Sequence, residues 1–434
     1  MDINAVLGGV DCACGKHHSC AIEHVYIERG AIAHLGELCE AYKHILLVAD
    51  ENTYAAAGKQ TEDALGEKIS GRVIFDGKTV LIPDEQAIER IRASLENTDL
   101  IGGTDLIGGT DLIVGIGSGV IQDLCKYIAK YDHLPYMVVA TAPSMDGYAS
   151  TGAAMILGGM KETVPAGVPL AIVADTEVLC RAPMEMICAG YGDIIGKYSA
   201  LNDWKLANVV FGEYLCPYIY DTTYAMILEV QKIVSGLLSR APDSVGTLME
   251  ALVMVGIMMS FAGSSRPASG SEHHLSHFFE ITGIVHGKPY LPHGIDVAYS
   301  TVITAKIREQ LLSTPWPDTP YELPRKQYLA AMNETYGSVG PSCVALQDKL
   351  GRYSEDRLSL YRAHEREIRD ILAEMPTSRE IEAILLPAAL HMEEFYAVYG
   401  KQNIHDAVRY AKDLKDRYTV LWLNYDINGG SFDE

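Results

Sequence analysis

Short and almost wholly apolar runs recur along the chain as far as Ala174, and they limit the folds open to it. They are His44–Asp50, Arg72–Asp76, Asp111–Gly115, Tyr136–Ala140 and Leu170–Ala174. Runs in which apolar and polar residues do not alternate are typical of strands covered on both faces, as in a parallel sheet. Segments with helical spacing lie between them, for example Asp84–Leu95. This alternation predicts a nucleotide-binding α/β sheet.

The pattern changes after about Leu179, where strand-like runs largely stop and long amphipathic helices follow. A chain of 434 residues is long enough for two domains. We therefore expect an α/β domain over residues 1–178 and an all-α domain over residues 179–434. The apolar stretch Ala251–Gly263 is too short to cross a bilayer and is expected to form a buried core helix.

One phrase, TDLI, occurs three times in succession between Asn97 and Ile113, and its first two copies are each followed by two glycines. The unit is too short for a solenoid repeat. Only the third copy continues into a long apolar stretch, so we assign the sheet strand to that copy. Glycine pairs are poor in strand interiors, and the two earlier copies are expected to lengthen the preceding connection at little cost.

The formal net charge of −22 argues against nucleic-acid binding and against membrane-surface binding or insertion. A small anionic substrate would need a local positive centre such as a metal ion. The N-terminal segment lacks the pattern of a signal peptide. Nine scattered cysteines indicate reduced thiols, and these features together predict a cytoplasmic protein.

Soft metal ligands are concentrated near the N-terminus, at Cys12, Cys14, His17, His18 and Cys20. Residues of these types at this spacing could hold zinc. The paired C-x-x-C arrangement of common zinc sites is absent, so free thiols without a metal are the alternative.

Two turns rich in small residues follow neighbouring apolar runs. Gly115–Asp123 (GIGSGVIQD) leads from a strand into a helix, where backbone amides can approach a pyrophosphate. Thr141–Ser150 (TAPSMDGYAS) follows the next strand. Glycines of a purely structural turn are the alternative for the first segment, but ligands of open α/β sheets gather at the carboxyl ends of strands. The pair of turns favours a cofactor crevice.

The helical half contains a possible metal-binding set. Asp193 is flanked by glycines, and His273 and His277 share a face if their segment is helical, whereas His274 points elsewhere. His293 follows further along the chain. One carboxylate and two imidazoles suit zinc, iron(II) or nickel(II), with a position left open for substrate.

The motifs GSGVIQD, TAPSMDGYAS, AGYGDIIGK, SSRPASGSEHHLSH and a later HG together resemble the bacterial sn-glycerol-1-phosphate dehydrogenases. That family belongs to the superfamily of dehydroquinate synthases, glycerol dehydrogenases and iron-type alcohol dehydrogenases. The resemblance spans roughly residues 20–300 and implies a dehydroquinate synthase-like fold. Such a fold has a Rossmann-like cofactor-binding domain and an α-helical metal- and substrate-binding domain, with the active site in the cleft between them. It also implies a cytoplasmic homodimer that uses nickel or zinc.

The resemblance further implies roles for individual residues. Metal ligands would be Asp193, His273 and His293; substrate contacts would be Asp146, Asp193 and His277, of which Asp193 and His277 would be catalytic. Contacts to the nicotinamide cofactor would be Asn52, Gly119, Val120, Ile121, Gln122, Asp123, Thr141, Ala142, Pro143, Ser144 and Ser150. Asp50 and Glu51 follow a strand end, where acidic charge disfavours a 2′-phosphate, so NAD is expected before NADP.

The expected reaction is the reversible reduction of dihydroxyacetone phosphate to sn-glycerol 1-phosphate, in glycerophospholipid or polyol-phosphate metabolism. The metal would bind the carbonyl oxygen of this small phosphorylated substrate as a Lewis acid. Glycerol dehydrogenase, 3-dehydroquinate synthase and a non-enzymatic sugar-phosphate-binding protein are the alternatives. Arg266 is either a contact to the substrate phosphate or a surface ion-pair residue.

Overall fold

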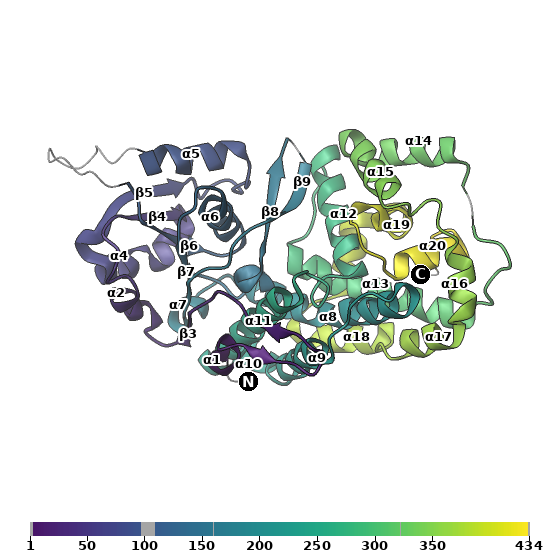
Figure 1. The fold of residues 1–434 in the computed structure, drawn as a ribbon, viewed down its shortest axis with the longest axis horizontal. Helices are drawn as coiled ribbons and strands as arrows, with labels where there is room; N and C mark the ends of the chain where they lie inside the picture. The colour runs from purple at the N-terminus through teal and green to yellow at the C-terminus, as the bar shows by residue number, and fades with distance from the viewer. Residues whose placement is uncertain (1–2, 97–108, 159, 322, 433–434) are drawn as a thin grey trace. The chain divides into compact units, whose positions relative to one another are not determined.

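The computed structural model describes residues 3–96, 109–158, 160–321 and 323–432, and the chain forms two compact units. Unit 1 comprises Met1–Gly190 and Lys232–Ser265, and unit 2 comprises Tyr191–Gln231 and Arg266–Glu434. In Figure 1 the purple-to-blue part of the chain carries a sheet with flanking helices, and the green-to-yellow part is helical. The assignment of cofactor binding to residues 1–178, and of metal and substrate binding to residues 179–434, stays a prediction.

Unit 1 is built on a six-stranded sheet in which neighbouring strands are parallel, in the order β3-β10-β7-β6-β4-β5. The strands are β3 (His24–Glu28), β4 (Ile45–Asp50), β5 (Ile69–Phe75), β6 (Leu112–Gly117), β7 (Tyr136–Ala140) and β10 (Ala171–Asp175). The expected parallel α/β sheet is therefore confirmed, and β6 begins in the third TDLI copy. The first two copies lie outside the described residues.

Both faces of this sheet are buried, which explains the unbroken apolar runs. Successive residues of a strand point to opposite faces. Leu47 and Val114 therefore pack into one hydrophobic cluster, which contains residues of α2 and α4, while Leu46 and Ile113 pack into a second cluster with α5 and α6. The helices of this unit are α1 (Ile3–Leu7), α2 (Leu35–Leu38), α3 (Glu51–Thr53), α4 (Lys59–Leu65), α5 (Glu85–Glu96), α6 (Gly119–Tyr131), α7 (Thr176–Leu179), α10 (Val234–Leu238) and α11 (Pro242–Ala262).

Three pieces of β structure in unit 1 carry no strong signal in the sequence. The edge strand β3 mixes polar and apolar residues, because only part of it is buried. The antiparallel pair of β8 (Gly152–Leu157) and β9 (Met160–Pro165) lies outside the main sheet. A two-residue pair, β1 (Val10–Asp11) with β2 (His17–His18), forms a small N-terminal hairpin.

Helix α11 contains the apolar stretch that was expected in the core. Among the described residues it is the helix long and apolar enough to cross a membrane, with a mean hydropathy of 1.8, but 78% of the apolar window is buried within the protein. The helix extends beyond the apolar stretch at its N-terminal end. It begins at Pro242, and proline is well suited to the first turn of a helix. Its Gly256 lies against the backbone of Asp146, where an added Cβ would come within 2.8 Å of the carbonyl oxygen.

Unit 2 consists of helices and the loops that join them, with no β-strand among its described residues. Helix α8 (Met184–Phe211) begins in unit 1 and continues into unit 2. The other helices are α9 (Pro217–Lys232), α12 (Ser271–His286), α13 (His293–Ser313), α14 (Arg325–Tyr336), α15 (Gly340–Lys349), α16 (Arg357–Ala363), α17 (Glu365–Ala373), α18 (Ser378–Leu385), α19 (Met392–Tyr410) and α20 (Val420–Asn428). The change to helical structure expected after Leu179 is confirmed.

Asp111, in the third TDLI copy, ties the chain before β6 to the start of β4. Its carboxylate accepts hydrogen bonds from the backbone N–H groups of Lys43 (2.8 Å) and His44 (3.0 Å), just before β4. We expect Asp111→Ala to lower the free energy of unfolding by about 1–2 kcal/mol, because two backbone donors lose a charged acceptor. Asp105→Ala, at the matching position of the second copy, is the control and should leave the denaturant midpoint unchanged. Equal losses in both variants would contradict the assignment of the strand to the third copy.

Candidate functional site

Three side chains of the predicted metal set converge in unit 2. The donor atoms of Asp193, His273 and His293 all lie within 4.8 Å of one another. His273 Nε2 is 3.6 Å from Asp193 Oδ1, close to the separation of about 3.0–3.4 Å between two ligands that share one metal ion. Asp193 and His273 are buried and His293 is partly exposed. The set is therefore preformed and accessible on one side, and its role as a metal centre stays a prediction.

Glycines bring the helices that carry this set close together. Asp193 lies on α8 between Gly192 and Gly196, and His293 is the first residue of α13. An added Cβ at Gly192 would lie 2.5 Å from Gly294 O and 2.8 Å from Ala298 Cβ, so a larger residue would push α13 away. The glycines that flank Asp193 in the sequence thus serve packing, and this packing places its carboxylate beside His293.

Glu272 orients one of the two imidazoles. Its Oε1 lies 2.7 Å from His273 Nδ1, while His273 Nε2 faces Asp193. A histidine whose Nδ1–H donates to a carboxylate keeps Nε2 as a metal-binding lone pair. Burial, and next the proximity of Asp203, raise the pKa of Glu272 to about 7. Ser276 stands in a similar relation to His293, with its Oγ 3.4 Å from Nδ1.

The electrostatics of the set also suit a cation. Burial, followed by the nearby Lys197 ammonium, lowers the pKa of His273 well below its ordinary value, so the ring is neutral near pH 7. Lys197, one turn after Asp193 on α8, donates to Asp193 Oδ1 over 2.6 Å, and both side chains are buried. Sequence reasoning missed Lys197, Glu272 and Ser276, because each is a common polar residue whose burial is visible only in the fold.

His277 and His274 occupy different environments. The ring of His277 is centred 6.3 Å from that of His273 and 5.5 Å from that of His293, so it borders the set. It does not belong to the group of donor atoms formed by Asp193, His273 and His293. His274 is fully buried, and burial lowers its pKa. The expectation that His274 points away from the shared face agrees with this placement.

The predicted cofactor residues lie at one edge of the sheet in unit 1. The strands β4, β6 and β7 are neighbours, and their carboxyl ends lead to Asn52, Gly119 and Thr141 respectively. The backbone N–H of Thr141 donates to Gly117 O over 3.3 Å, which joins the two small-residue turns. Ligands of open α/β sheets gather at the carboxyl ends of the strands, and cofactor binding by these residues stays a prediction.

The glycines of the first turn divide into two groups. A Cβ at Gly115 would meet Cys125 Sγ at 2.8 Å, and one at Gly117 would meet Ile121 Cβ at 2.6 Å, so both allow α6 to pack on β6. Gly119 begins α6 and has open space where a Cβ would stand. The structural alternative thus applies to the first two glycines, while Gly119 is suited to the close approach of a ligand.

The residues that follow Gly119 differ in exposure. The side chains of Ile121 and Gln122 are buried, and Gln122 Nε2 donates to Tyr148 O over 2.7 Å. Val120 and Asp123 are partly exposed. A cofactor at this helix start would meet Ile121 through its backbone N–H, as anions do at helix N-termini. The backbone N–H of Gln122 already donates to Ser118 O over 3.0 Å, so a contact from Gln122 to the cofactor stays a prediction.

The second turn is held by a lysine that sequence reasoning missed. Lys126 is buried, and its Nζ donates to Ser150 Oγ (3.0 Å), to Gly152 O (3.1 Å) and to Gly147 O. The hydroxyl of Ser150, a predicted cofactor contact, is therefore engaged in fixing the turn. Asp146 begins the short 3₁₀ segment η5 (Asp146–Ala149).

Other members of this turn are placed by packing. Tyr148 Oη donates to Ala142 O over 2.8 Å, and Gly190 of α8 lies against Pro143 O, with no room for a side chain between them. Ser144 is partly exposed. The backbone of this turn is thus fixed on both sides.

The acidic residues after β4 are less free than the sequence suggested. Asp50 caps the start of α3, where its Oδ1 accepts the Thr53 N–H over 2.8 Å. Glu51 Oε2 accepts the Gly77 N–H over 3.3 Å, and Asn52 Nδ2 donates to Gly77 O over 2.8 Å. The preference for NAD over NADP stays a prediction.

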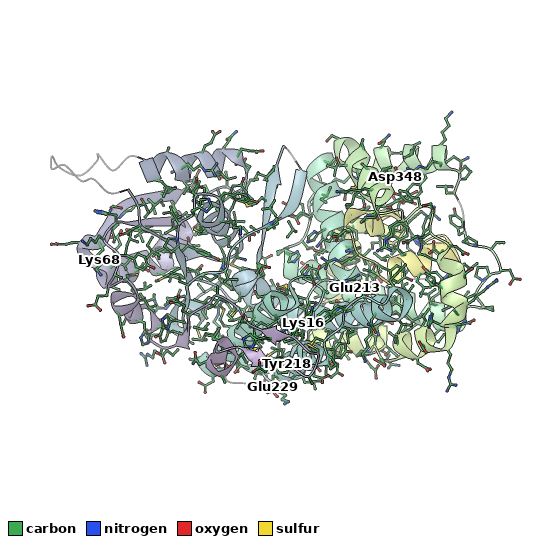
Figure 2. All side chains as sticks on the ribbon, in the orientation of Figure 1. Lys16, Lys68, Glu213, Tyr218, Glu229 and Asp348 are labelled. Carbon is green, nitrogen blue, oxygen red and sulfur yellow. The ribbon has the colours of Figure 1, made fainter. Side chains whose placement is uncertain are left out.

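Arg266 is neither a surface residue nor available to a phosphate. It is 5% exposed, and its Nε and Nη2 both contact the carboxylate of Glu213 at 2.5 Å, while Nη1 donates to Tyr418 O over 2.7 Å. A buried guanidinium requires such partners. Figure 2 marks Glu213 among the side chains.

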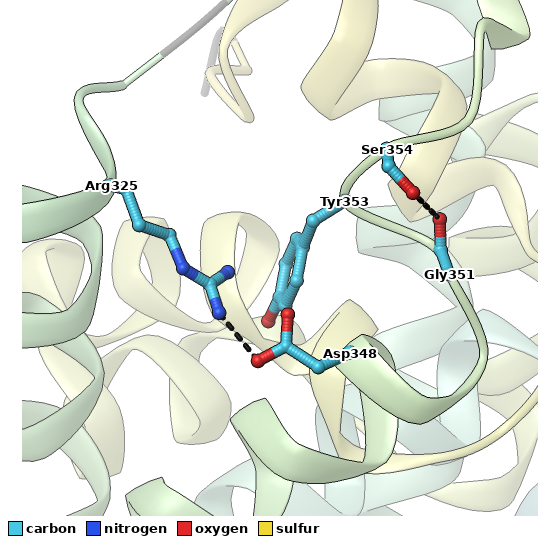
Figure 3. Close-up of a pocket in the computed structure, with 5 residues that line it drawn as sticks. All are labelled: Arg325, Asp348, Gly351, Tyr353 and Ser354. Carbon is cyan, nitrogen blue, oxygen red and sulfur yellow. Dashed lines mark hydrogen bonds and ion pairs between the residues drawn. The ribbon is translucent and has the colours of Figure 1, made fainter.

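A pocket of about 210 Å³ elsewhere in unit 2 contains none of the predicted site residues. Figure 3 shows Arg325 in it, paired with Asp348 over 2.6 Å, and the Arg325 guanidinium also lies 4.4 Å from the ring centroid of Tyr353. Arg325, the cationic residue that lines the pocket, is therefore already paired, and we assign the pocket no part in the candidate site.

Comparison with known proteins identifies the family. Residues 26–183 match the family model "Iron-containing alcohol dehydrogenase". A glycerol-1-phosphate dehydrogenase [NAD(P)+] of Geobacillus thermodenitrificans is 32% identical over 320 residues, which cover 72% of this chain and 76% of that protein. A protein of the same name from Geobacillus stearothermophilus is 29% identical over 421 residues, 95% of each chain. One from Methanosarcina acetivorans is 34% identical over 253 residues, 58% of this chain and 68% of that protein.

Solved structures share the fold. Maleylacetate reductase from Rhizobium sp. superposes with a TM-score of 0.57 at 13% identity, covering 96% of this chain and 99% of that one. An alcohol dehydrogenase from Oenococcus oeni has a TM-score of 0.59 at 14% identity, with 92% and 94% coverage. The fold is that of the iron-containing alcohol dehydrogenases. Within that class, the chain belongs to the family of glycerol-1-phosphate dehydrogenases.

Gly119 provides a test of the cofactor edge. Because a Cβ there meets open space, Gly119→Val should fold with an unchanged melting temperature but keep a pyrophosphate from the helix start. We expect the dissociation constant for NADH, measured by fluorescence titration, to rise at least about tenfold, or about 1.4 kcal/mol. Gly117→Val is the contrasting variant and should lower the melting temperature through its clash with Ile121. Unchanged NADH binding in Gly119→Val would return this glycine to a structural role.

Glu272 provides a test of imidazole orientation. Glu272→Gln removes the charge that holds His273 Nδ1–H, and we expect the affinity for a divalent metal to fall about 10- to 100-fold. Competition with a chromophoric chelator measures this without any assay of activity. Glu280→Gln, on the same helix, is the matched control and should retain the affinity of the parent protein. Equal affinities in the two variants would contradict an orienting role for Glu272.

Proposed function

We propose that this protein catalyses the reversible, NAD(P)H-linked reduction of dihydroxyacetone phosphate to sn-glycerol 1-phosphate. The observation that carries the proposal is the convergence of Asp193, His273 and His293, in a chain of this family. One carboxylate and two imidazoles are a donor set for a catalytic divalent ion with an open position. We propose nickel or zinc as that ion.

Different side chains of unit 2 would bind the metal, orient its ligands and contact the substrate. Asp193, His273 and His293 would hold the ion, and Glu272 and Ser276 would orient the two imidazoles. When bound, the metal polarises a carbonyl oxygen and the nicotinamide supplies a hydride. His277 borders the set and would hold the substrate hydroxyl or carry its proton, since an imidazole exchanges protons near neutral pH.

The first unit would hold the cofactor at the edge described above. The start of α6 at Gly119 offers backbone N–H groups to a pyrophosphate, and the turn of Thr141, Ala142, Pro143 and Ser144 flanks it. Asp146 is proposed as a substrate contact. We propose NAD as the preferred cofactor, because acidic residues such as Asp50 and Glu51 at a strand end would disfavour a 2′-phosphate. A cytoplasmic homodimer is the proposed state of the protein.

Metal content separates the roles of the four histidines. Asp193→Ala, His273→Ala and His293→Ala should each lose the metal after dialysis and lose turnover, because each removes a ligand. His277→Ala should keep most of the metal and lose turnover. His274→Ala should keep the metal, although the cavity it leaves lowers the melting temperature. Loss of metal from His277→Ala, with retention in His273→Ala, would identify His277 as the ligand. This outcome would contradict the assignment of His273, which lies one helical turn earlier.

The substrate is tested by offering three compounds to the metal-loaded protein. Dihydroxyacetone phosphate should support NADH oxidation, and the product should resist sn-glycerol-3-phosphate dehydrogenase, which establishes its configuration. Dihydroxyacetone should react at least about tenfold less efficiently if the substrate phosphate contributes 1.4 kcal/mol or more. Faster reaction with dihydroxyacetone would indicate a glycerol dehydrogenase. Conversion of the precursor of dehydroquinate without net oxidation of NADH would indicate a synthase, and binding without any turnover would indicate a sugar-phosphate-binding protein.

A further inference from the structure

A second group of metal-binding side chains lies in the N-terminal hairpin of unit 1 and takes no part in the proposed function. The strands β1 and β2 pair antiparallel, with Val10 opposite His18 and Asp11 opposite His17. The loop between them is closed by hydrogen bonds from Cys12 N to Lys16 O (3.1 Å) and from Gly15 N to Cys12 O (3.0 Å). Figure 2 marks Lys16 in this loop.

Three side chains of the hairpin converge. The donor atoms of Cys12, Cys14 and His18 lie within 4.8 Å of one another, and Cys14 Sγ is 3.4 Å from His18 Nε2. Sulfur and nitrogen ligands of one tetrahedral zinc ion stand about 3.6 Å apart, given bonds of about 2.3 and 2.0–2.1 Å. The backbone N–H of Cys14 also points at Cys12 Sγ over 3.5 Å, an arrangement that favours a thiolate. The spacing of these donor atoms suits a single metal ion.

The environment of His18 supports a ligand role for this ring. The side chain is buried, and it stacks on Phe261 with ring centroids 5.4 Å apart and an angle of 13° between the planes. This stacking fixes the ring with Nε2 toward Cys14. His17, on the opposite face of the two-residue strand, is exposed and pairs with Asp11 over 2.8 Å. Because successive residues of a strand point to opposite faces, His18 lies beside Cys14 and His17 does not.

We infer that Cys12, Cys14 and His18 bind a structural zinc ion that ties the N-terminal hairpin together. Two thiolates and a neutral imidazole carry a charge of −2, which a divalent ion balances, and soft sulfur donors favour zinc over harder cations. None of the nine cysteines forms a disulfide. A fourth ligand would complete the tetrahedron. The residues are distinct from Asp193, His273 and His293, so the inference is independent of the proposed function.

Cobalt substitution tests the site in the parent protein. Cobalt(II) bound to cysteine gives an intense thiolate charge-transfer absorption in the near ultraviolet, which a carboxylate–imidazole site lacks. We expect this band in the cobalt-loaded chain, and we expect a mercurial thiol reagent to release one zinc ion per chain from the zinc form. Absence of the thiolate band from the cobalt-loaded parent would overturn the inference, whatever the activity of the enzyme.

Variants locate the ligands. Cys14→Ser and His18→Gln should each contain one zinc ion fewer per chain than the parent and melt several degrees lower, because zinc binding contributes to the stability of the hairpin. His17→Gln, the neighbouring histidine on the opposite face, is the matched control and should keep the full zinc content. Zinc content equal to that of the parent in Cys14→Ser and His18→Gln would also overturn the inference. Turnover of dihydroxyacetone phosphate reports separately on the proposed function.

Discussion

The buried carboxylate of Asp203 holds together the helices on which the candidate metal centre depends. Asp203 lies on α8, and its Oδ1 accepts hydrogen bonds from Arg308 Nη2 on α13 (2.7 Å) and from the Val420 N–H of α20 (2.9 Å). Its Oδ2 accepts the N–H of Ser271, the first residue of α12, over 2.6 Å. A buried charge is stable only when its hydrogen bonds are satisfied, and here four helices supply or use them. Because His273 follows Ser271 by two residues, this bond sets the height of the imidazole along α12.

Glycines let the same helices pack closely together. Gly270 stands just before α12, and a Cβ there would lie 2.7 Å both from Ala200 Cα and from Asp203 Oδ2. Gly192 likewise allows α8 and α13 to approach closely, because an added Cβ there would clash with α13. Backbone packed this closely leaves little freedom to the side chains it carries, so Asp193 and His293 are held in position before any ligand arrives. The cost is intolerance of substitution, since overpacking of this kind destabilises a core by about 1–3 kcal/mol.

Much of the fold could be predicted because burial leaves a direct trace in the sequence. The central strands are apolar on both faces and were all recognised, whereas β3 and β8, which are only partly buried, were not. The convergence of Asp193, His273 and His293 followed from spacing and family resemblance. Polar residues that act through burial gave no such signal: Lys126, Lys197 and Glu272 look in sequence like solvated charges. Arg266 illustrates the same limit, because its buried pairing with Glu213 depends on contacts distant in sequence.

The chain as a whole is strongly acidic, whereas the candidate metal centre is not, and this difference affects how an anionic substrate could bind. A net charge of −22 repels a phosphorylated triose from most of the surface. Near the candidate ligands, however, the negative charge of Asp193 is offset by Lys197, His273 is neutral, and burial raises the pKa of Glu272 to about 7, which reduces the charge of that carboxyl. A divalent ion bound there therefore adds charge to a nearly neutral group instead of being cancelled by several carboxylates. The resulting local excess of positive charge, in a buried setting of low dielectric, is what an anionic substrate and a developing alkoxide oxygen require.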